Sequence, residues 1–247
     1  MPSTLNQSLE NKMSVILNTI KGLESYDLSK SEKFMEHHNT PHSKTQAILD
    51  QFQNNFYEFL EDNEDIVAVD LGANIGLFSI YLSSICKEVY GLEPTPSHFE
   101  IMEDLIDKLE IKNIFPTQAA VHIENGESEF QLNSSNSTMN SFFRHGIDPG
   151  GTESVMVPTV KLADFIKNTV KKRVNFVKMD IEGFENVVVN DDTFDEAIKE
   201  IDAIYVEVHD FDGTGKMTEN VKRITKKLNS LGKKTMQLTD DGVLAYD

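Results

Sequence analysis

The sequence predicts an α/β protein in which helices cover both faces of a doubly wound, mostly parallel sheet. From Asp65 onward, short apolar runs of strand length alternate with longer helical stretches, a pattern typical of parallel sheets. The first run closes on a glycine turn at Leu71-Gly72. Near the end of the chain, Asp240-Asp241-Gly242 separates two apolar runs. This pattern predicts a hairpin that adds antiparallel pairing at one edge of the sheet.

The expected elements follow in chain order. Each strand is a compact run rich in Val, Ile, Leu or Tyr, as buried parallel strands require. We expect strands at Ile66–Leu71, Glu88–Leu92, Val174–Met179, Ile201–Val208, Lys234–Leu238 and Val243–Tyr246, and further extended pieces at Asn113–Pro116 and Gln118–Ile123. We expect helices at Ile75–Ile85, Pro96–Leu109, Thr193–Lys199 and Val221–Leu231. Residues 124–160 are rich in Ser, Asn and Gly and interrupt the alternation.

A helical extension is expected over residues 1–62, ahead of a domain at 63–247. Apolar residues recur at three- and four-residue steps over Leu5–Ile20, and a second apolar stripe covers Ile48–Phe59. Such stripes need a surface that covers them. The extension is therefore expected either to cap the ligand cleft or to mediate self-association.

Composition excludes several classes of protein. The 247 residues include 23 Lys+Arg against 41 Asp+Glu, a formal net charge of −18. Nucleic-acid binding needs a concentrated basic surface, so no nucleic-acid partner is expected. The single cysteine rules out an internal disulfide and a CxxC site. The sequence shows neither a secretory signal nor an apolar run of about 20 residues. We therefore expect a soluble cytoplasmic protein that does not insert into membranes.

The segment Val67-Ala-Val-Asp-Leu-Gly-Ala-Asn-Ile-Gly76 predicts a ligand-binding turn between a strand and a helix. In open α/β sheets, ligands bind beyond the carboxyl ends of the strands. Gly72 and Gly76 lack a Cβ, so the backbone is expected to approach the ligand there; Asn74 lies between them and is assigned to the same site. The spacing is not the GxGxxG of a pyrophosphate cradle. The Asp70 carboxylate would repel a pyrophosphate and suit a ligand with a positive charge.

Glu93 follows at the end of the next strand. An acidic residue about 20 positions after such a turn can accept hydrogen bonds from both ribose hydroxyls of a nucleoside. Asp70 and Glu93 together describe an adenosyl ligand with a cationic tail. S-adenosylmethionine fits this description, because it carries a ribose, an ammonium and a sulfonium.

The second motif is Phe176-Val-Lys-Met-Asp-Ile-Glu-Gly-Phe-Glu185, in which a buried strand ends in Asp180. In a doubly wound sheet this strand lies beside the first one, so Asp180 is expected to face the same cleft as Asp70. Glu182 and Glu185 are expected near the start of the next helix, where acidic groups also have a purely structural role.

Together, VAVDLGANIG, the strand-end GLEP and KMDIEGFE resemble the FkbM family of S-adenosylmethionine-dependent methyltransferases. The resemblance runs over about residues 66–210, and KMDIEGFE is its most specific marker. It implies the class I methyltransferase fold, a Rossmann-like sheet of seven strands, and O-methylation of a sugar, glycan or small natural product. Class I methyltransferases contact adenine after the third strand, which assigns Gln118 and Ala119 to cofactor binding.

The third constellation is Tyr205-Val-Glu-Val-His209. Residues two apart in a strand share a face, so Tyr205, Glu207 and His209 line one side. Unpaired ionisable groups are costly to bury, which favours a functional role for this side. Methyl transfer to a hydroxyl needs alignment and proton removal. His209 is the expected base, since its reference pKa is about 6.5, and Glu207 or Asp180 would orient it.

A metal-dependent variant stays open. Asp180, Glu182, Glu207 and His209 could present carboxylate oxygens and one imidazole to Mg²⁺ or Mn²⁺, which would bind and acidify the acceptor hydroxyl. Nothing in the spacing demands a metal, so none is expected.

Two functions of other classes also remain open at this point. A nicotinamide-dependent oxidoreductase would use the same fold, although the third glycine is missing and Asp70 is unfavourable. A non-catalytic cofactor-binding module would keep the fold without turnover. The expected partner is a small-molecule or glycan acceptor.

Overall fold

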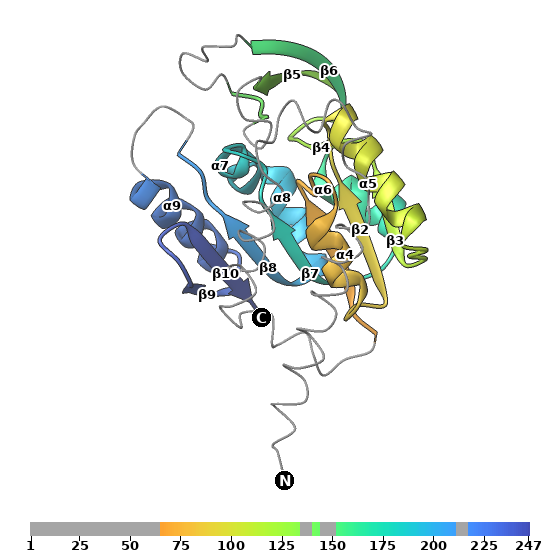
Figure 1. The fold of residues 1–247 in the computed structure, drawn as a ribbon. Helices are drawn as coiled ribbons and strands as arrows, with labels where there is room; N and C mark the ends of the chain where they lie inside the picture. Colours follow the sequence, from red (N-terminus) through yellow and green to blue (C-terminus); the bar gives the residue numbers. More distant parts are fainter. Residues whose placement is uncertain (1–64, 134–139, 144–151, 211–216) are drawn as a thin grey trace.

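The computed structural model describes residues 65–133, 140–143, 152–210 and 217–247 of the chain (Figure 1). The helices expected over residues 1–62 lie outside the described residues. The domain boundary expected near residue 63 therefore stays a prediction.

The main sheet has seven strands in the order β3-β2-β1-β7-β8-β10-β9. Neighbours from β3 to β8 are parallel, and β10 runs antiparallel to both β8 and β9. The predicted fold class is confirmed, including the antiparallel C-terminal hairpin. These strands are β1 (Val67–Leu71), β2 (Glu88–Leu92), β3 (Ile114–Thr117), β7 (Val174–Met179), β8 (Ile201–Glu207), β9 (Lys234–Gln237) and β10 (Gly242–Tyr246).

Helices cover both faces of this sheet because successive strand residues point to opposite sides. Val69 and Val177 pack with the helices of one face, and Ala68 and Phe176 pack with those of the other. The second face carries α4 (Leu77–Ser83) and α5 (Pro96–Lys108). The first carries α6 (Leu162–Phe165), the π-helix η4 (Ile166–Val170), α7 (Glu185–Asn190), α8 (Asp192–Ala197), the 3₁₀-helix η5 (Ile198–Glu200) and α9 (Met217–Ser230).

A second, three-stranded sheet has the order β4-β6-β5. It consists of β4 (Ala120–Val121), β5 (Gly126–Asn133) and β6 (Thr152–Val160). The β5–β6 pair lies at one end of the molecule, away from β9 and β10 (Figure 1). The extended piece expected at Gln118–Ile123 therefore belongs to this sheet, and the interval 124–160 contains a long antiparallel pair. Its strands expose much of their length, so they lack the continuous apolar run that marks a buried strand.

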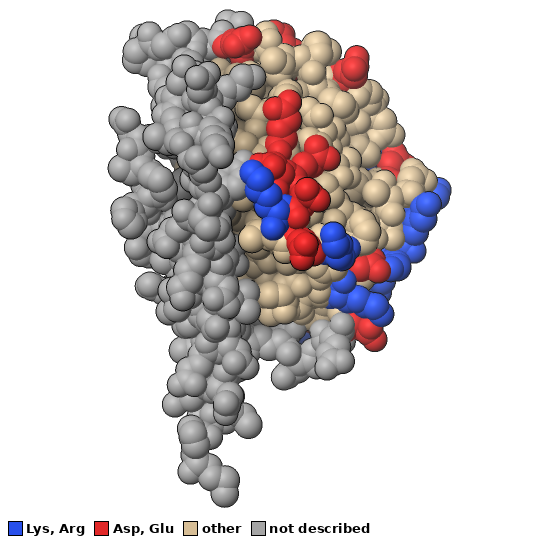
Figure 2. Space-filling view, turned by 45° about the vertical axis from the view of Figure 1, so that its right-hand side comes forward, with Lys and Arg blue, Asp and Glu red and all other residues tan. Residues whose placement is uncertain are grey.

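Figure 2 shows acidic side chains across the middle of the described surface, with basic side chains beside them and along the right-hand edge. The basic side chains on this face have acidic side chains among them. None of the helices in the described ranges is long and apolar enough to cross a membrane.

Candidate active site

A cavity of about 220 Å³ opens at the carboxyl ends of β1, β2 and β7. The turn after β1 forms its floor, and residues after β2 and β7 form two sides. The second sheet and the segment around Asn140 add a further wall. In an open α/β sheet this is the place where ligands bind. The lining residues used below are Gly72, Asn74, Glu93, Thr95, His98, Ala119, Phe130, Asn140, Phe142, Lys178, Asp180 and Glu182.

The turn after β1 is held by backbone geometry. Gly72 has φ +81° and Gly76 has φ +86°, and both angles favour glycine. A Cβ on Gly72 would lie 1.8 Å from the carbonyl oxygen of Asp180, and one on Gly76 would lie 2.6 Å from Cγ of Met102. We expected these glycines to let the backbone approach a ligand. In the structure, the space beside them is filled by Asp180, after β7, and by Met102 of α5. Glycine at these positions therefore lets the turn pack closely against β7 and α5.

Glu93 fixes the loop on the β2 side of the cavity. Its Oε2 accepts from the amide of Asn74 at 2.8 Å, and its Oε1 accepts from the amide of Thr95 at 2.8 Å. His98 Nδ1 lies 3.6 Å from the same Oε1. Burial by itself raises the pKa of Glu93, but His98 and the Thr95 hydrogen bonds outweigh it and leave the pKa below its usual range. A buried carboxylate therefore faces the cavity in its charged form.

Asp70 lies within β1, beneath the turn, and does not line the cavity. It is fully buried, and its Oδ2 accepts from the hydroxyl of Ser79 at 2.6 Å. Burial raises the pKa of Asp70, and the charge of Lys178 opposes that shift only in part. The structure thus separates the two acidic residues, with Glu93 at the cavity surface and Asp70 below it.

The two residues expected to contact adenine also separate. Ala119 is buried and lines the cavity, whereas Gln118 is exposed and does not.

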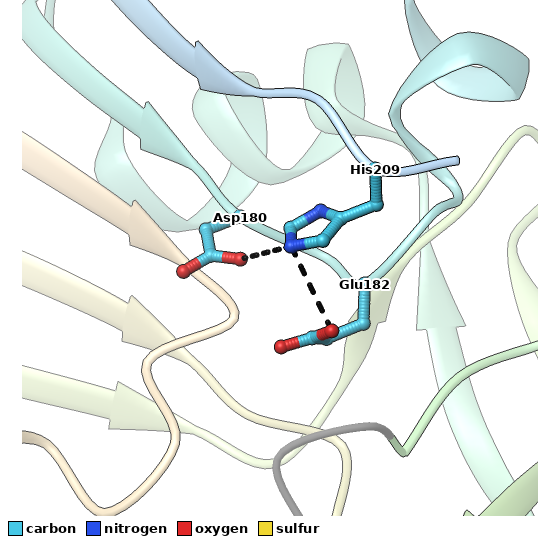
Figure 3. A group of neighbouring side chains, drawn as sticks. All are labelled: Asp180, Glu182 and His209. Carbon is cyan, nitrogen blue, oxygen red and sulfur yellow. Dashed lines mark ion pairs between the residues drawn. The ribbon is translucent and has the colours of Figure 1, made fainter. Parts of the chain in front are cut away.

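Asp180 and Glu182 reach the cavity from the segment after β7, and His209 joins them from the segment after β8 (Figure 3). His209 Nε2 lies 3.8 Å from Asp180 Oδ1 and 3.7 Å from Glu182 Oε2. The expected meeting of Asp180 and His209 results from β7 and β8 being parallel neighbours. Glu182 points into the same group because its backbone adopts φ 51°, which turns the chain sharply before Gly183.

Glu185 supports this group from inside the protein. It is the first residue of α7 and is fully buried. Its Oε1 accepts from the amides of Ile181 at 3.0 Å and Gly183 at 3.1 Å. The same oxygen lies 3.0 Å from Nδ1 of His209. One carboxylate therefore closes the turn that carries Glu182 and orients the imidazole.

The ionisable side chains around His209 change one another's pKa values. Burial alone lowers the pKa of His209, but the Glu185 hydrogen bond and the nearby carboxylates outweigh it and raise the pKa to about 10. Burial, reinforced by the charge of Asp180, raises the pKa of Glu182 to about 8 and that of Glu207 to about 7. Burial also favours the neutral form of Asp180, but Lys178 outweighs it and lowers the pKa.

Lys178 and an aromatic wall formed by Phe130 and Phe142 were not predicted from the sequence. Lys178 is buried, lines the cavity and donates to Asp180 Oδ2 at 2.7 Å. A lysine inside an otherwise apolar strand is the signal that could have identified it. The rings of Phe130 and Phe142 lie 5.0 Å apart in an edge-on arrangement. They come from the interval that showed no period, so the sequence offered no comparable signal.

Comparisons with known proteins identify the family to which the sequence is similar. The sequence profile of the methyltransferase FkbM domain matches residues 70–235. A search of curated proteins found no match.

Among solved structures, fibrillarin from Aeropyrum pernix, with natively bound S-adenosyl-L-methionine, has a TM-score of 0.42 and 14% identity over 76% of this chain and 67% of that chain. Precorrin-6y C5,15-methyltransferase from Geobacter metallireducens has a TM-score of 0.44 and 12% identity over 76% of this chain and 83% of that one. A SAM-dependent methyltransferase from Aquifex aeolicus has a TM-score of 0.42 and 14% identity, with coverages of 78% and 86%.

The profile match spans well over half of the chain and includes the turn after β1, Glu93, Asp180 and His209. The chain therefore belongs to the FkbM family of S-adenosylmethionine-dependent methyltransferases.

Proposed function

We propose that the protein is an O-methyltransferase that acts on a hydroxyl of a sugar, a glycan or a small natural product. The observation that carries the proposal is that one cavity has two separate polar sides. Glu93 follows β2, and Asp180 follows β7, with β1 between them. Two strand spacings are roughly 10 Å, which leaves room for a nucleoside at one side and a reacting centre at the other.

The cofactor side is assigned to Glu93, the turn at residues 72–76 and Ala119. Each carboxylate oxygen can accept two hydrogen bonds, and each oxygen of Glu93 accepts one from a backbone amide. Oε1 also faces His98, so the remaining capacity of Oε2 is the part that suits a ribose hydroxyl. Asp70 is assigned an indirect role, because it supports the turn through Ser79 from below the cavity.

The acceptor side is assigned to Asp180, Glu182, Glu207 and His209. S-adenosylmethionine, when bound, supplies a methyl group activated by its sulfonium. The chain aligns the acceptor hydroxyl and takes its proton as the O–CH₃ bond forms and the S–CH₃ bond breaks. Glu182 and Glu207 have pKa values of about 8 and about 7, near the operating pH at which a general base works best. Without a bound metal ion, His209 is the cation that offsets their negative charge.

The aromatic wall supports a hydroxyl-rich acceptor. Phe130 and Phe142 line the same cavity as the buried amide of Asn140. An apolar face next to a hydrogen-bonding group matches a sugar ring, which has C–H faces and a hydroxyl edge. The same wall would also accept the ring of an aromatic natural product.

The test is methyl transfer from S-adenosylmethionine with an isotopically labelled methyl group. The acceptor panel pairs sugars, glycans and hydroxylated natural products with amine analogues of matched shape. We expect a labelled methyl ether and S-adenosylhomocysteine in equal amounts. Transfer to the amines alone would reject O-methylation while leaving the family assignment intact.

The two alternative functions give different outcomes in that assay. A non-catalytic module would bind S-adenosylmethionine in calorimetry and yield no methylated product with any acceptor. A nicotinamide-dependent oxidoreductase would bind NADH in saturation-transfer NMR and not S-adenosylmethionine. Membership of the FkbM family favours the methyltransferase.

A further inference from the structure

We propose that Asp180, Glu182 and His209 form a binding site for one divalent cation of the Mg²⁺ and Mn²⁺ class. Each residue offers one ligand atom, and these atoms all lie within 4.8 Å of one another. The role of the cation in proton removal rests on the proposed O-methyl transfer, but the binding site itself does not.

The distances suit a single ion. In an octahedral site with ligands at about 2.1 Å, neighbouring ligand atoms lie about 3.0 Å apart and opposite ones about 4.2 Å apart. His209 Nε2 lies 3.8 Å from Asp180 Oδ1 and 3.7 Å from Glu182 Oε2. Both separations fall inside the octahedral limits, and the oxygens of Asp180 and Glu182 lie within 4.8 Å of each other. The three ligands come from two adjacent strand ends, and Figure 3 shows both carboxylates beside the same ring nitrogen.

The orientation of the imidazole is an independent observation that points to a cation. Histidines that bind metals usually donate their other ring N–H to a carboxylate, which fixes the tautomer and the ring direction. Glu185 is fully buried, and its Oε1 lies 3.0 Å from Nδ1 of His209. Its two amide bonds hold it in place. This leaves Nε2 as the ring nitrogen that faces Asp180 and Glu182.

Asp180 gives a second independent observation. Its Oδ2 accepts from Lys178, which is buried. Its Oδ1 is shielded from solvent and has no hydrogen-bond partner among the residues that the structure describes. A buried carboxylate oxygen without a partner is costly. A cation between Oδ1 of Asp180 and Nε2 of His209 would give this oxygen a partner.

The ligand types select the class of ion. Two carboxylates and one imidazole combine oxygen ligands suited to Mg²⁺ and Mn²⁺ with a nitrogen that Mn²⁺ also accepts. Such ions keep several waters, and Asp180 and Glu182 both line the cavity. A hydroxyl of the acceptor would replace one of those waters, and the cation would lower its pKa.

The experiment titrates the purified full-length protein with Mn²⁺ in the absence of cofactor and acceptor. Electron paramagnetic resonance counts bound Mn²⁺, and its pulsed form detects the nitrogen of a coordinated imidazole. We expect one Mn²⁺ per chain with an imidazole nitrogen signal. Glu182→Gln and His209→Ala should weaken binding at least tenfold, the lower end for disturbed metal sites, and His209→Ala should also lose the nitrogen signal.

Glu103→Gln is the matched control, because Glu103 is exposed on α5 and the substitution removes the same charge. It should bind Mn²⁺ like the wild type. Circular dichroism checks that each variant is folded; if His209→Ala is not, the partly exposed Glu182→Gln still decides the question. Several weak Mn²⁺ sites that are equal in all variants, without a nitrogen signal, would overturn the proposal.

A chelator separates this proposal from the proposed function. Loss of methyl transfer in EDTA, with recovery on addition of Mn²⁺, supports both. Methyl transfer that resists EDTA in a protein without a Mn²⁺ site rejects the cation site and keeps the methyltransferase. One Mn²⁺ bound through imidazole, in a protein that methylates no hydroxyl, keeps the cation site and rejects O-methylation.

Discussion

Nδ1 of His209 lies 3.0 Å from Oε1 of Glu185, and this carboxylate is fully buried at the start of α7. The pair sets the protonation of the imidazole. From sequence, His209 was expected to act as a neutral base with a pKa of about 6.5. The surrounding carboxylates raise its pKa to about 10, although burial opposes them. An imidazolium cannot accept the proton of a hydroxyl, which is the reason for proposing the carboxylates as the base.

The first prediction concerns this pair. Glu185→Gln should lower the pKa of His209 towards its reference value, because it removes both the charge and the strongest hydrogen-bond acceptor. NMR titration of the metal-free protein measures the shift, with the signal assigned by its loss in His209→Ala. Glu103→Gln should leave the titration unchanged. A wild-type His209 that titrates near 6.5 would contradict the assigned coupling.

The second prediction concerns Glu93. Its folded pKa is lowered, so its contribution to stability is present above its unfolded pKa and is lost as pH falls through the folded value. Glu93→Gln should therefore flatten the dependence of the free energy of unfolding on pH between about 5 and 3. Urea unfolding across this range measures the difference. Equal slopes for both proteins would show that the loop does not depend on this charge.

Glu93→Gln should also weaken binding of S-adenosylmethionine. The loss should be about 1.5–3 kcal/mol, the usual contribution of a hydrogen bond to a charged group. Calorimetry at neutral pH, where both proteins are folded, gives the comparison. Equal affinities would remove Glu93 from the cofactor site.

The third prediction separates two effects of glycine. Gly76→Ala places a Cβ 2.6 Å from Cγ of Met102 at φ +86°. Gly232 has φ +91°, but nothing lies within 4 Å of the added Cβ. Both substitutions carry the cost of a left-handed backbone, roughly 1–2 kcal/mol. Only Gly76→Ala adds overpacking, about 1–3 kcal/mol. Urea unfolding should therefore show Gly76→Ala as the less stable protein, and equal losses would mean that α5 moves aside freely.

The fourth prediction uses the single cysteine. Cys86 is buried, and burial raises the pKa of its thiol to about 12. Thiol reagents attack the thiolate, so labelling of the native protein should be slow and should follow unfolding. In Ser84→Cys with Cys86→Ala, the thiol sits at an exposed position of the same turn and should react at once. Rapid labelling of native wild type would show that this turn opens.

Sequence patterns located the buried strands well and the irregular elements poorly. The bounds expected for the second and fourth strands of the main sheet in chain order are those of β2 and β7, because a strand buried on both faces is a largely apolar run. The helix expected to begin near Glu185 is α7, but its end was not predicted, since its sequence Glu-Asn-Val-Val-Val-Asn is rich in β-branched residues. In the structure this segment packs against α8 and α9.

The candidate site also has some features that the sequence predicts and others that it does not. Strand order brings Asp180 and His209 together, and alternating strands and helices predict that order. The contacts of Glu185 and Lys178 depend on side-chain direction after a sharp turn. Glu182 adopts a left-handed conformation there, which residue spacing alone does not reveal.

The last prediction concerns turnover. Asp180→Asn keeps the shape of the side chain but removes the charge that faces both Lys178 and His209. It should lower kcat by about 10²–10⁴, the usual contribution of positioned proton transfer. The Kd for S-adenosylmethionine should change little, because Glu93 and the turn after β1 lie on the other side of the cavity. Single-turnover kinetics and calorimetry measure the two quantities separately, with Glu103→Gln as the control for loss of charge. A variant that keeps full turnover, or one that loses cofactor affinity in proportion to activity, would place Asp180 on the cofactor side instead.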